Sequence, residues 1–591
     1  MMILFQLRDL LAMTYLFNDP AQFAVELADG YAAAHRDKIL RVDGGVIRRH
    51  KAKPGQVVVV IGGGSGHYPA FGGFVGHGLA HGAALGNVFA APSAQQICNV
   101  AHAVDAGGGI VFCFANYAGD VLNFTQAQER LRAQGIDVRP VVVTDDIASA
   151  PVHEQHKRRG IAGTLAVFKA AAVAADAGKT IDEVVRIAAA ANSRVRSLGV
   201  AFSGCTLPGA AKPLFEVEPG IMEVGMGIHG EPGLNRVKAP SADGLAELLA
   251  DKLLAEIPET VNNISGARIG VILNGLGAVK YEELFVVYRK IEQLLTARGL
   301  IIVAPVVDEL ITSFDMAGVS LTLFWLDDAL EQSWLAAADT PAFHRGVVMS
   351  AGPMIDHVVE SKGSQGKFTI RSGSPESQAV ANIVLLAFEA ALGAIEAQQD
   401  ELGQLDAIAG DGDHGIGMQR GLKAGVDAIK KVMAFQAGAG TALTAAGDAW
   451  SDRAGGTSGM LWGVILRNFG NSLSDEIKPD ASMIAAGVTA ALQAVIDVGK
   501  AQLNDKTLVD VLYPFSAALT KGAAQGLSIA EAWTAAAEVA QQSAEATKNL
   551  IPKIGRARPH ADKSIGNPDP GAVSMALIID AVGRIIRGHC F

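Results

Sequence analysis

The chain has 591 residues, a formal net charge of −11 and an apolar fraction of 50%. This length predicts about three or four domains, and the lack of any lysine- or arginine-rich run argues against nucleic acid and an anionic membrane surface as partners. The four cysteines have no CxxC spacing. That argues against a zinc site or a disulfide framework and favours a cytoplasmic setting.

Residues 13–191 are expected to form a first α/β domain. The apolar start of the chain lacks the basic residues and the cleavage site of a signal peptide, and Met13 is a second candidate start. A helix is expected over residues 18–35. The stretch 54–104 carries no acidic or basic residue, but glycines, prolines and four histidines interrupt it. It therefore predicts a buried substrate-binding core rather than a membrane segment.

A central strand is expected at residues 57–61, VVVVI, because a strand covered on both faces is apolar throughout. It runs into the glycine-rich loop 62–69, GGGSGHYP. His67 stands where the dinucleotide pattern GxGxxG and the hydrolase pattern GxSxG require glycine, and the P-loop GK[ST] is absent. The remaining interpretation is a tight loop that presents Ser65 and His67 where open α/β sheets bind ligands.

More strand–loop units follow in this domain. A strand at 110–114 leads into NYAGD, which carries Asn116 and Asp120, and a strand at 141–143 precedes two further aspartates. A helix is expected over 163–177. This alternation of strands and helices predicts a mostly parallel sheet with helices on both faces.

A second α/β domain is expected over residues 192–345, with strands at 198–202, 268–273 and 300–305. The stretch IMEVGMGIHGEPG places His229 between glycines, with Glu231 two residues later. The Ser/Gly-rich stretch 346–378 then reads as a linker.

The remaining residues, 379–591, are alanine-rich with helical periodicity and predict an all-α domain. Two segments, 454–463 and 555–572, are expected to be loops. Consecutive backbone N–H groups of the first could bind a phosphate. Helices are expected over 379–397, 440–450, 480–498, 508–526 and 529–546.

An acidic stretch near the start of this domain, LDAIAGDGDHGIGM, holds Asp406, Asp411 and Asp413 among glycines and contains no lysine or arginine. Oxygen-only ligands select Mg2+ or Ca2+. An EF-hand is excluded because Gly415 and Leu422 occupy its fifth and twelfth positions. A solvated Asp/Gly turn is the alternative. Because Mg2+ often shares its coordination with phosphates, the stretch predicts a phosphate-bearing ligand.

Taken together, these motifs resemble a single-chain, ATP-dependent dihydroxyacetone kinase over nearly the whole chain. The N-terminal half resembles the ketose-binding subunit through GGGSGH, NVFAAPS, NYAGDVLNF, RRGIAGT and MGIHGEPG. The C-terminal half resembles the nucleotide-binding subunit through GDGDHG, GGTSG, DKTLVDVLYP and KSIGNPDPGA. The resemblance implies two α/β domains with mostly parallel or mixed sheets, followed by an all-α helical barrel, and a homodimer.

The resemblance also implies roles for individual residues. His229 would bind the ketose carbonyl covalently as a hemiaminal. Asp120, with His67, would bind the substrate and take the proton of the attacking hydroxyl, while Arg556 would steady the departing phosphoryl group. Mg2+ would be held by Asp406, Asp411 and Asp413. The implied ketose-binding residues are Gly64, Ser65, Gly66, His67, Asn116, Asp120 and His229. The implied ATP-binding residues are His414, Gly456, Thr457, Ser458, Gly459, Arg556, Asp569 and Gly571.

Three positions depart from the family pattern. Tyr68 replaces a glutamate, Ala115 a lysine and Asn87 an acid, all in or near the expected ketose pocket, whereas the metal motif is intact. We therefore expect the phosphoryl-transfer chemistry to be kept and the ketose to differ, with erythrulose a candidate beside dihydroxyacetone. The alternatives are a metal-dependent lyase that forms cyclic FMN from FAD, a non-catalytic ketose sensor, and a phosphotransferase-system version that depends on a partner protein.

Overall fold

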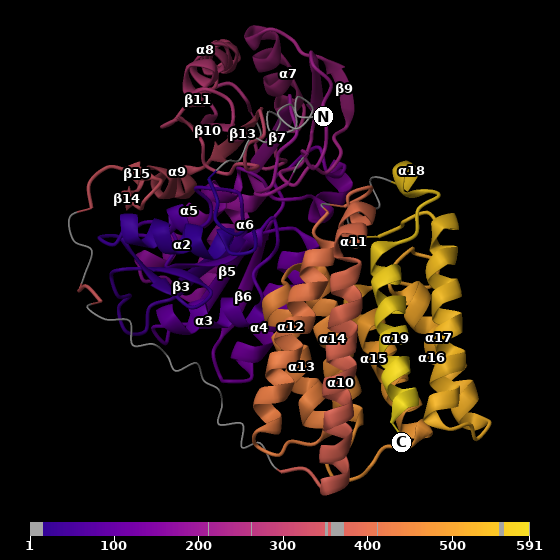
Figure 1. Cartoon of the computed structure of the whole chain (residues 1–591). Coiled ribbons are helices and arrows are strands. Elements are labelled where there is room, and N and C mark those ends of the chain that lie inside the picture. Colours follow the sequence, from indigo (N-terminus) through magenta and orange to yellow (C-terminus); the bar gives the residue numbers. More distant parts are fainter. Residues whose placement is uncertain are drawn as a thin grey trace. The chain divides into compact units, whose positions relative to one another are not determined.

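The structure is a computed structural model, and it describes residues 16–210, 212–261, 263–348, 353–355, 372–410, 412–554 and 561–589. The chain divides into two compact units, residues 1–363 and 364–591. The first unit is α/β and the second is helical (Figure 1). The expected fold class is confirmed.

The first sheet of the α/β unit has the strand order β1-β2-β4-β3-β5-β6. Strands β4, β3, β5 and β6 are parallel, whereas β1 and β2 pair antiparallel, so the sheet is mixed rather than all-parallel. Its strands are β1 (Ile39–Val42), β2 (Gly45–Arg48), β3 (Val58–Ser65), β4 (Gly82–Val88), β5 (Ile110–Ala115) and β6 (Val138–Val143).

Helices cover both faces of this sheet, which explains the uninterrupted apolar run in β3. Val58 and Val60 pack with α3 (Ala94–Val104) and α4 (Ala118–Arg132) in one buried cluster. The alternate residues Val59 and Ile61 belong to a second cluster, which contains α5 (Thr164–Asp176). Helices α2 (Phe23–Ala34) and α6 (Ile181–Ser193) complete this part of the unit, and the expected boundary at 191–192 falls near the end of α6.

The second sheet has the order β11-β10-β13-β7-β8-β9, with β12 also paired to β10, and most of its pairs are antiparallel. Helices α7 (Ala242–Leu254) and α8 (Tyr281–Ala297) pack on one face. Residues of its other face, such as Ile272 and Phe324, join the same buried cluster as α5 and β3. The strands are β7 (Val195–Ala201), β8 (Ile221–Val224), β9 (Asn235–Lys238), β10 (Arg268–Gly275), β11 (Ile301–Ile302), β12 (Val306–Asp308) and β13 (Gly318–Leu326).

The strand expected over 300–305 is shorter than predicted. Only β11, of two residues, forms there, because the backbone turns at Ala304, which has φ of 44°, before β12 begins. The unit ends with α9 (Asp328–Leu335) and a small hairpin of β14 (Ala338–Asp339) and β15 (His344–Arg345).

The helical unit is a closed barrel, because each wall helix packs on the next in chain order and α19 returns to α10. Its wall helices are α10 (Pro375–Ala397), α12 (His414–Met433), α13 (Ala439–Ala454), α14 (Gly456–Ser472), α15 (Ala481–Gly499), α16 (Val509–Ala524), α17 (Ile529–Ala546) and α19 (Pro570–Gly588). The short helices α11 (Gln399–Asp406) and α18 (Ala561–Ser564) lie at one end (Figure 1). An apolar cavity of about 150 Å3 lies inside the barrel.

Two of these wall helices, α10 and α15, are long and apolar enough by length and composition to cross a membrane. In this structure both contribute side chains to the barrel core, for example Phe388 and Val488. Their apolar character is therefore explained by packing within the barrel. The expected linker ends earlier than predicted, because α10 begins at Pro375.

Candidate active site

The glycine-rich stretch after the central strand is partly strand. Gly62 to Ser65 belong to β3, and the turn begins only at Gly66, which has φ of +96°. Ser65 donates its hydroxyl to the carbonyl of Gly86 (2.7 Å). The prediction of a loop over 62–69 is thus wrong for its first half, because these glycines pair with β4 along the edge of the strand.

The segment that precedes β13 holds this turn in place. The N–H of Phe314 donates to the carbonyl of Gly66 (2.8 Å), and the Thr312 hydroxyl donates to the carbonyl of Tyr68 (2.7 Å). His67 lies between these two contacts and is 1% exposed. The His67 backbone is therefore fixed from both sides.

Two predicted histidines, 162 positions apart in the chain, meet at this turn. Nε2 of His67 lies 3.0 Å from Nε2 of His229, and the two rings are nearly perpendicular. Nδ1 of His67 lies 2.8 Å from the carbonyl oxygen of Thr312. Nδ1 of His229 lies 3.1 Å from Oε1 of Glu231.

The partners of these rings determine where their protons lie. A carbonyl oxygen only accepts hydrogen bonds, so Nδ1 of His67 must carry a proton. Burial raises the pKa of Glu231, but His229 and Arg159 outweigh this effect and hold that pKa well below its ordinary value. The ionised carboxylate of Glu231 accepts, so Nδ1 of His229 is also protonated. A hydrogen bond between the two Nε2 atoms would then require one shared proton, which would give the histidine pair one positive charge opposite Glu231.

Aromatic side chains surround the histidine pair. The Phe89 ring centroid lies 5.1 Å from that of His67 and 5.4 Å from that of His229, and Phe89 has the rare backbone angle φ of 55°. The Tyr117 ring packs edge-on against His229, with the centroids 4.6 Å apart. The Tyr117 hydroxyl is buried and has no hydrogen-bond partner in the described part of the chain. Sequence reasoning did not assign roles to Phe89 or Tyr117.

The other predicted ketose residues lie on neighbouring elements. Asp120 is buried in the first turn of α4. Asn116, between β5 and α4, donates its side-chain amide to the carbonyls of His156 and Arg158, so its remaining polar atom is the acceptor Oδ1. Gly64 cannot carry a side chain, because a Cβ there would lie 2.8 Å from the backbone nitrogen of Ala90.

The three departures from the family pattern occupy different environments. Tyr68 is 52% exposed and packs edge-on against Tyr31. Ala115 is buried at the end of β5, where a Cβ added to Gly160 would lie 2.9 Å from the Ala115 methyl group. Asn87 is partly buried beside the irregular pairing of β3 with β4.

Two of the three predicted metal ligands, Asp406 and Asp413, lie at one end of the helical barrel. Asp406 ends α11, and its Oδ2 accepts the N–H of Gly412 (2.9 Å). Asp413 immediately precedes α12, and burial together with the nearby Asp406 raises its pKa to about 7. Asp411 lies outside the described residues, and within those residues no three acidic, histidine or cysteine side chains gather closely enough to hold an ion.

The donor set nevertheless fits a hard divalent cation. Asp406 and Asp413 offer only oxygen ligands, and their charges repel each other in a buried setting, as the raised pKa of Asp413 indicates. Asp569 shows the same effect, since burial and Asp406 raise its pKa to about 7. A cation would relieve this repulsion.

The predicted phosphate-binding residues that the structure describes lie at helix N-termini of the same unit. His414 begins α12, and its Nε2 lies 2.8 Å from the Ser574 hydroxyl in the first turns of α19. Asp569 caps α19 by accepting the N–H of Ala572 (2.8 Å), and a Cβ at Gly571 would lie 3.0 Å from its Oδ2. Arg556 lies outside the described residues.

The loop expected over 454–463 is wrong. Gly455, with φ of +68°, and Gly456, with φ of +62°, form a tight turn between α13 and α14, and α14 begins at Gly456. Thr457 and Ser458 are exposed in the first turn of α14, and Gly459 is buried. The Gly459 N–H donates to the carbonyl of Gly455 (3.1 Å), so the free N–H groups at this helix N-terminus are those of Gly456, Thr457 and Ser458. A helix N-terminus favours anions as a glycine loop would.

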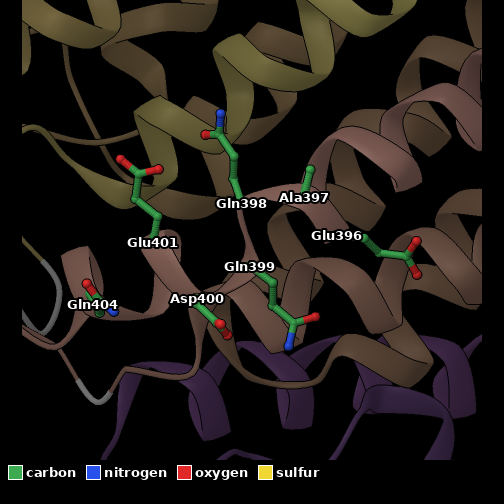
Figure 2. A pocket seen from close by; sticks show the side chains of 7 residues that line it. All are labelled: Glu396, Ala397, Gln398, Gln399, Asp400, Glu401 and Gln404. Atoms are coloured by element: carbon green, nitrogen blue, oxygen red, sulfur yellow. The ribbon is translucent and has the colours of Figure 1, made fainter.

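A polar depression of about 610 Å3 lies where α10 meets α11 (Figure 2). It adjoins the start of α12, because a Cβ at Gly415 would lie 2.1 Å from the carbonyl oxygen of Gln399. The depression is lined by Glu396, Ala397, Gln398, Gln399, Asp400, Glu401 and Gln404.

Comparison with known proteins places this chain in a family. A Dak1 domain matches residues 29–342, and a DAK2 domain matches residues 408–584. An L-erythrulose kinase from Pectobacterium atrosepticum is 56% identical, with 97% of each chain covered. A D-erythrulose kinase from Mycolicibacterium smegmatis is 49% identical, covering 97% of this chain and 99% of that one.

More distant relatives include a solved structure. The dihydroxyacetone kinase from C. freundii in complex with AMP-PNP and Mg2+ is 30% identical, with a TM-score of 0.51 and coverage of 97% of this chain and 99% of that one. A triokinase/FMN cyclase from Rattus norvegicus is 32% identical over 90% of this chain and 91% of its own.

These matches agree with the two-part architecture and confirm the resemblance found in the motifs. They extend over nearly the full length of the chain and include both halves. The chain therefore belongs to the dihydroxyacetone kinase family and is an ATP-dependent ketose kinase that carries both family domains in one polypeptide.

Proposed function

We propose that this protein transfers the γ-phosphoryl group of ATP to a terminal hydroxyl of erythrulose, held covalently on His229. The observation that carries the proposal is the buried contact of 3.0 Å between the Nε2 atoms of His67 and His229. The two relatives that are named erythrulose kinases support a four-carbon ketose.

Capture of the ketose follows from the shared proton of the histidine pair. The Nε2 lone pair of His229 attacks the carbonyl carbon and forms a C–N bond, while the carbonyl oxygen takes the shared proton from His67 and becomes a hydroxyl. The positive charge moves onto the His229 ring, whose Nδ1–H points at Glu231. Atoms and charge balance, and glycerol is rejected because it has no carbonyl carbon.

Phosphoryl transfer then needs a base and an anchored nucleotide. Asp120 accepts the proton of the terminal hydroxyl as that oxygen attacks the γ-phosphorus and ADP leaves. Reversal of the hemiaminal returns the proton to the histidine pair and releases the ketose phosphate. Asp120 is assigned this role by its place in the family motif and by its burial in the first turn of α4.

The helical unit would hold the nucleotide. Asp406, Asp411 and Asp413 would hold Mg2+, which neutralises phosphate charge when it is bound. The N–H groups of Gly456, Thr457 and Ser458 and the side chain of His414 would contact phosphates. Gly459, whose N–H donates to the carbonyl of Gly455 (3.1 Å), would shape the site together with Asp569 and Gly571. Arg556 would stabilise the departing phosphoryl group. We further propose a cytoplasmic homodimer, as the family resemblance implies.

The test is a substrate panel with the full chain. ADP release is measured with ATP, Mg2+ and either L-erythrulose, D-erythrulose, dihydroxyacetone or glycerol. We expect one erythrulose isomer to give the highest kcat/KM and glycerol to give none. Equal or better turnover of dihydroxyacetone would remove the case for an altered ketose, and no ketose-dependent ADP release would overturn the proposal.

Mass spectrometry of the intact protein adds a second readout. A ketose adduct is expected on the wild-type chain and is expected to be lost in His229→Ala. Formation of cyclic FMN from FAD would use only the helical unit's metal residues, so that activity should survive the same substitution. The relative named triokinase/FMN cyclase makes FAD worth including in the panel.

A further inference from the structure

A buried line of alternating charges runs away from the reactive histidine. Oε1 of Glu231 lies 3.1 Å from Nδ1 of His229, and Oε2 accepts the backbone N–H of His229 (3.0 Å). Nη1 of Arg159 lies 3.6 Å from Oε2 of Glu231. The same guanidinium bonds Oδ2 of Asp146 through Nη2 (2.9 Å) and Nε (3.0 Å).

Each member of this line is tied to the backbone as well. Arg159 donates to the carbonyl of Gly225 (3.2 Å), and Oδ1 of Asp146 accepts the N–H of Ala148 (3.0 Å). The Asp146 side chain is 2% exposed and that of Arg159 is 13% exposed. The orientation of the Glu231 carboxylate is therefore set by two successive buried contacts.

The loop that carries His229 has a glycine, Gly227, where it passes Glu231 and Arg159. A Cβ at Gly227 would lie 2.1 Å from Oε2 of Glu231 and 2.5 Å from Nη1 of Arg159. No side chain fits between these groups. The close approach of Glu231 and Arg159 therefore explains, on steric grounds alone, why position 227 is glycine.

The charges of the line suit the covalent step. Asp146, Arg159 and Glu231 together carry one net negative charge, and the nearest negative group, Glu231, contacts the imidazole. When Nε2 of His229 binds a carbonyl carbon, the ring becomes a cation that retains Nδ1–H. A fixed carboxylate at Nδ1 stabilises that cation and keeps the Nε2 lone pair directed at the substrate.

We propose that Glu231 is the positioning residue of His229 and that Arg159 and Asp146 act through it, so that ketose capture depends on this buried line. This inference rests on the proposed function. The line affects formation of the adduct and leaves nucleotide binding, which belongs to the helical unit, unchanged.

The test compares two matched pairs of variants. Glu231→Gln removes the negative charge beside His229, and Arg159→Lys keeps the positive charge but removes the guanidinium that contacts Asp146 and Glu231, each with little change in size. Arg158 and Glu256 provide the controls, because the fully buried side chain of Arg158 forms two contacts of 2.8 Å with Glu256, a carboxylate outside the line. The control variants are Arg158→Lys and Glu256→Gln.

We expect Glu231→Gln and Arg159→Lys to raise the KM for the ketose and lower the adduct yield by roughly 10- to 100-fold, the range for a lost hydrogen bond to a charged group. The KM for ATP should change less than about twofold. Both control variants should lower the melting temperature by a comparable amount but keep the ketose KM of the wild type.

Two results would overturn the inference. One is a wild-type ketose KM and adduct yield in Glu231→Gln, and the other is an equal rise of the ketose KM in Glu256→Gln, which would indicate general loosening of the unit. If Glu231→Gln does not fold, Arg159→Lys and Asp146→Asn test the same line. Failure of the proposed function itself is separate, because the wild-type chain would then show no ketose-dependent ADP release.

Discussion

Gly410→Ala should impair the use of MgATP without affecting capture of the ketose on His229. A Cβ at Gly410 would lie 2.3 Å from Oδ1 of Asp406, the first predicted metal ligand. Ordinary contact between these atoms begins at about 3.4 Å, so the carboxylate must move by about 1 Å. Gly410 has no positive φ, so alanine itself is allowed by the backbone.

A displacement of this size in a positioning group costs about 100-fold in rate. We therefore expect kcat/KM for MgATP to fall by about two orders of magnitude in Gly410→Ala. The ketose adduct on His229, read by intact mass spectrometry, should remain at the wild-type level, because His229 belongs to the α/β unit. Calorimetric titration with MgATP measures the nucleotide affinity directly.

Gly393→Ala is the matched control. Gly393 lies in α10 of the same unit, and a Cβ there meets no atom within 4 Å. Alanine in a helix is favoured over glycine by about 1 kcal/mol, so this variant should keep full activity and melt no lower than the wild type. Unchanged MgATP affinity in Gly410→Ala would refute the placement of Asp406 at the metal.

Two further outcomes are expected. Tyr117→Phe should keep or slightly raise the melting temperature, because the Tyr117 hydroxyl has no hydrogen-bond partner in the described residues. If a ketose hydroxyl is its partner in the complex, the same substitution should raise the ketose KM several-fold. An unchanged ketose KM in steady-state assays would exclude that contact. Burial and the nearby Arg48 lower the pKa of His81 to about 4. Between about pH 6.5 and 4, His81 is therefore protonated in the unfolded chain but not in the folded chain. Roughly 3 kcal/mol of folding stability that is present above this pH range is lost as the pH falls through it. His81→Gln should therefore flatten the decline in melting temperature between pH 7 and 5, whereas the partly exposed His102→Gln should not, and equal pH dependence in wild type and His81→Gln would contradict this assignment.

Local patterns predicted most of the elements near the site. The run VVVVI became part of β3 because alternate side chains enter two separate cores, and the alanine-rich periodic stretches became the barrel helices. The prediction failed where glycines are tolerated inside regular structure. Gly62 to Gly64 continue β3, where the Ala84 carbonyl, the Phe71 ring and the Ala90 backbone leave no space for a larger residue. Gly456 begins α14 because the tight turn there requires a positive φ.

The candidate histidine among glycines and the carboxylate-rich turn were predictable from the chain, because each depends on residues adjacent in sequence. Three features could not be predicted in this way: the contact between His67 and His229, the positive φ of Phe89 beside them, and the ion line through Arg159. Those contacts join segments tens to hundreds of positions apart, and they arise only because two sheets pack into a common buried cluster that brings their loops together. Distances and proton positions of that kind follow from packing, which no local pattern encodes.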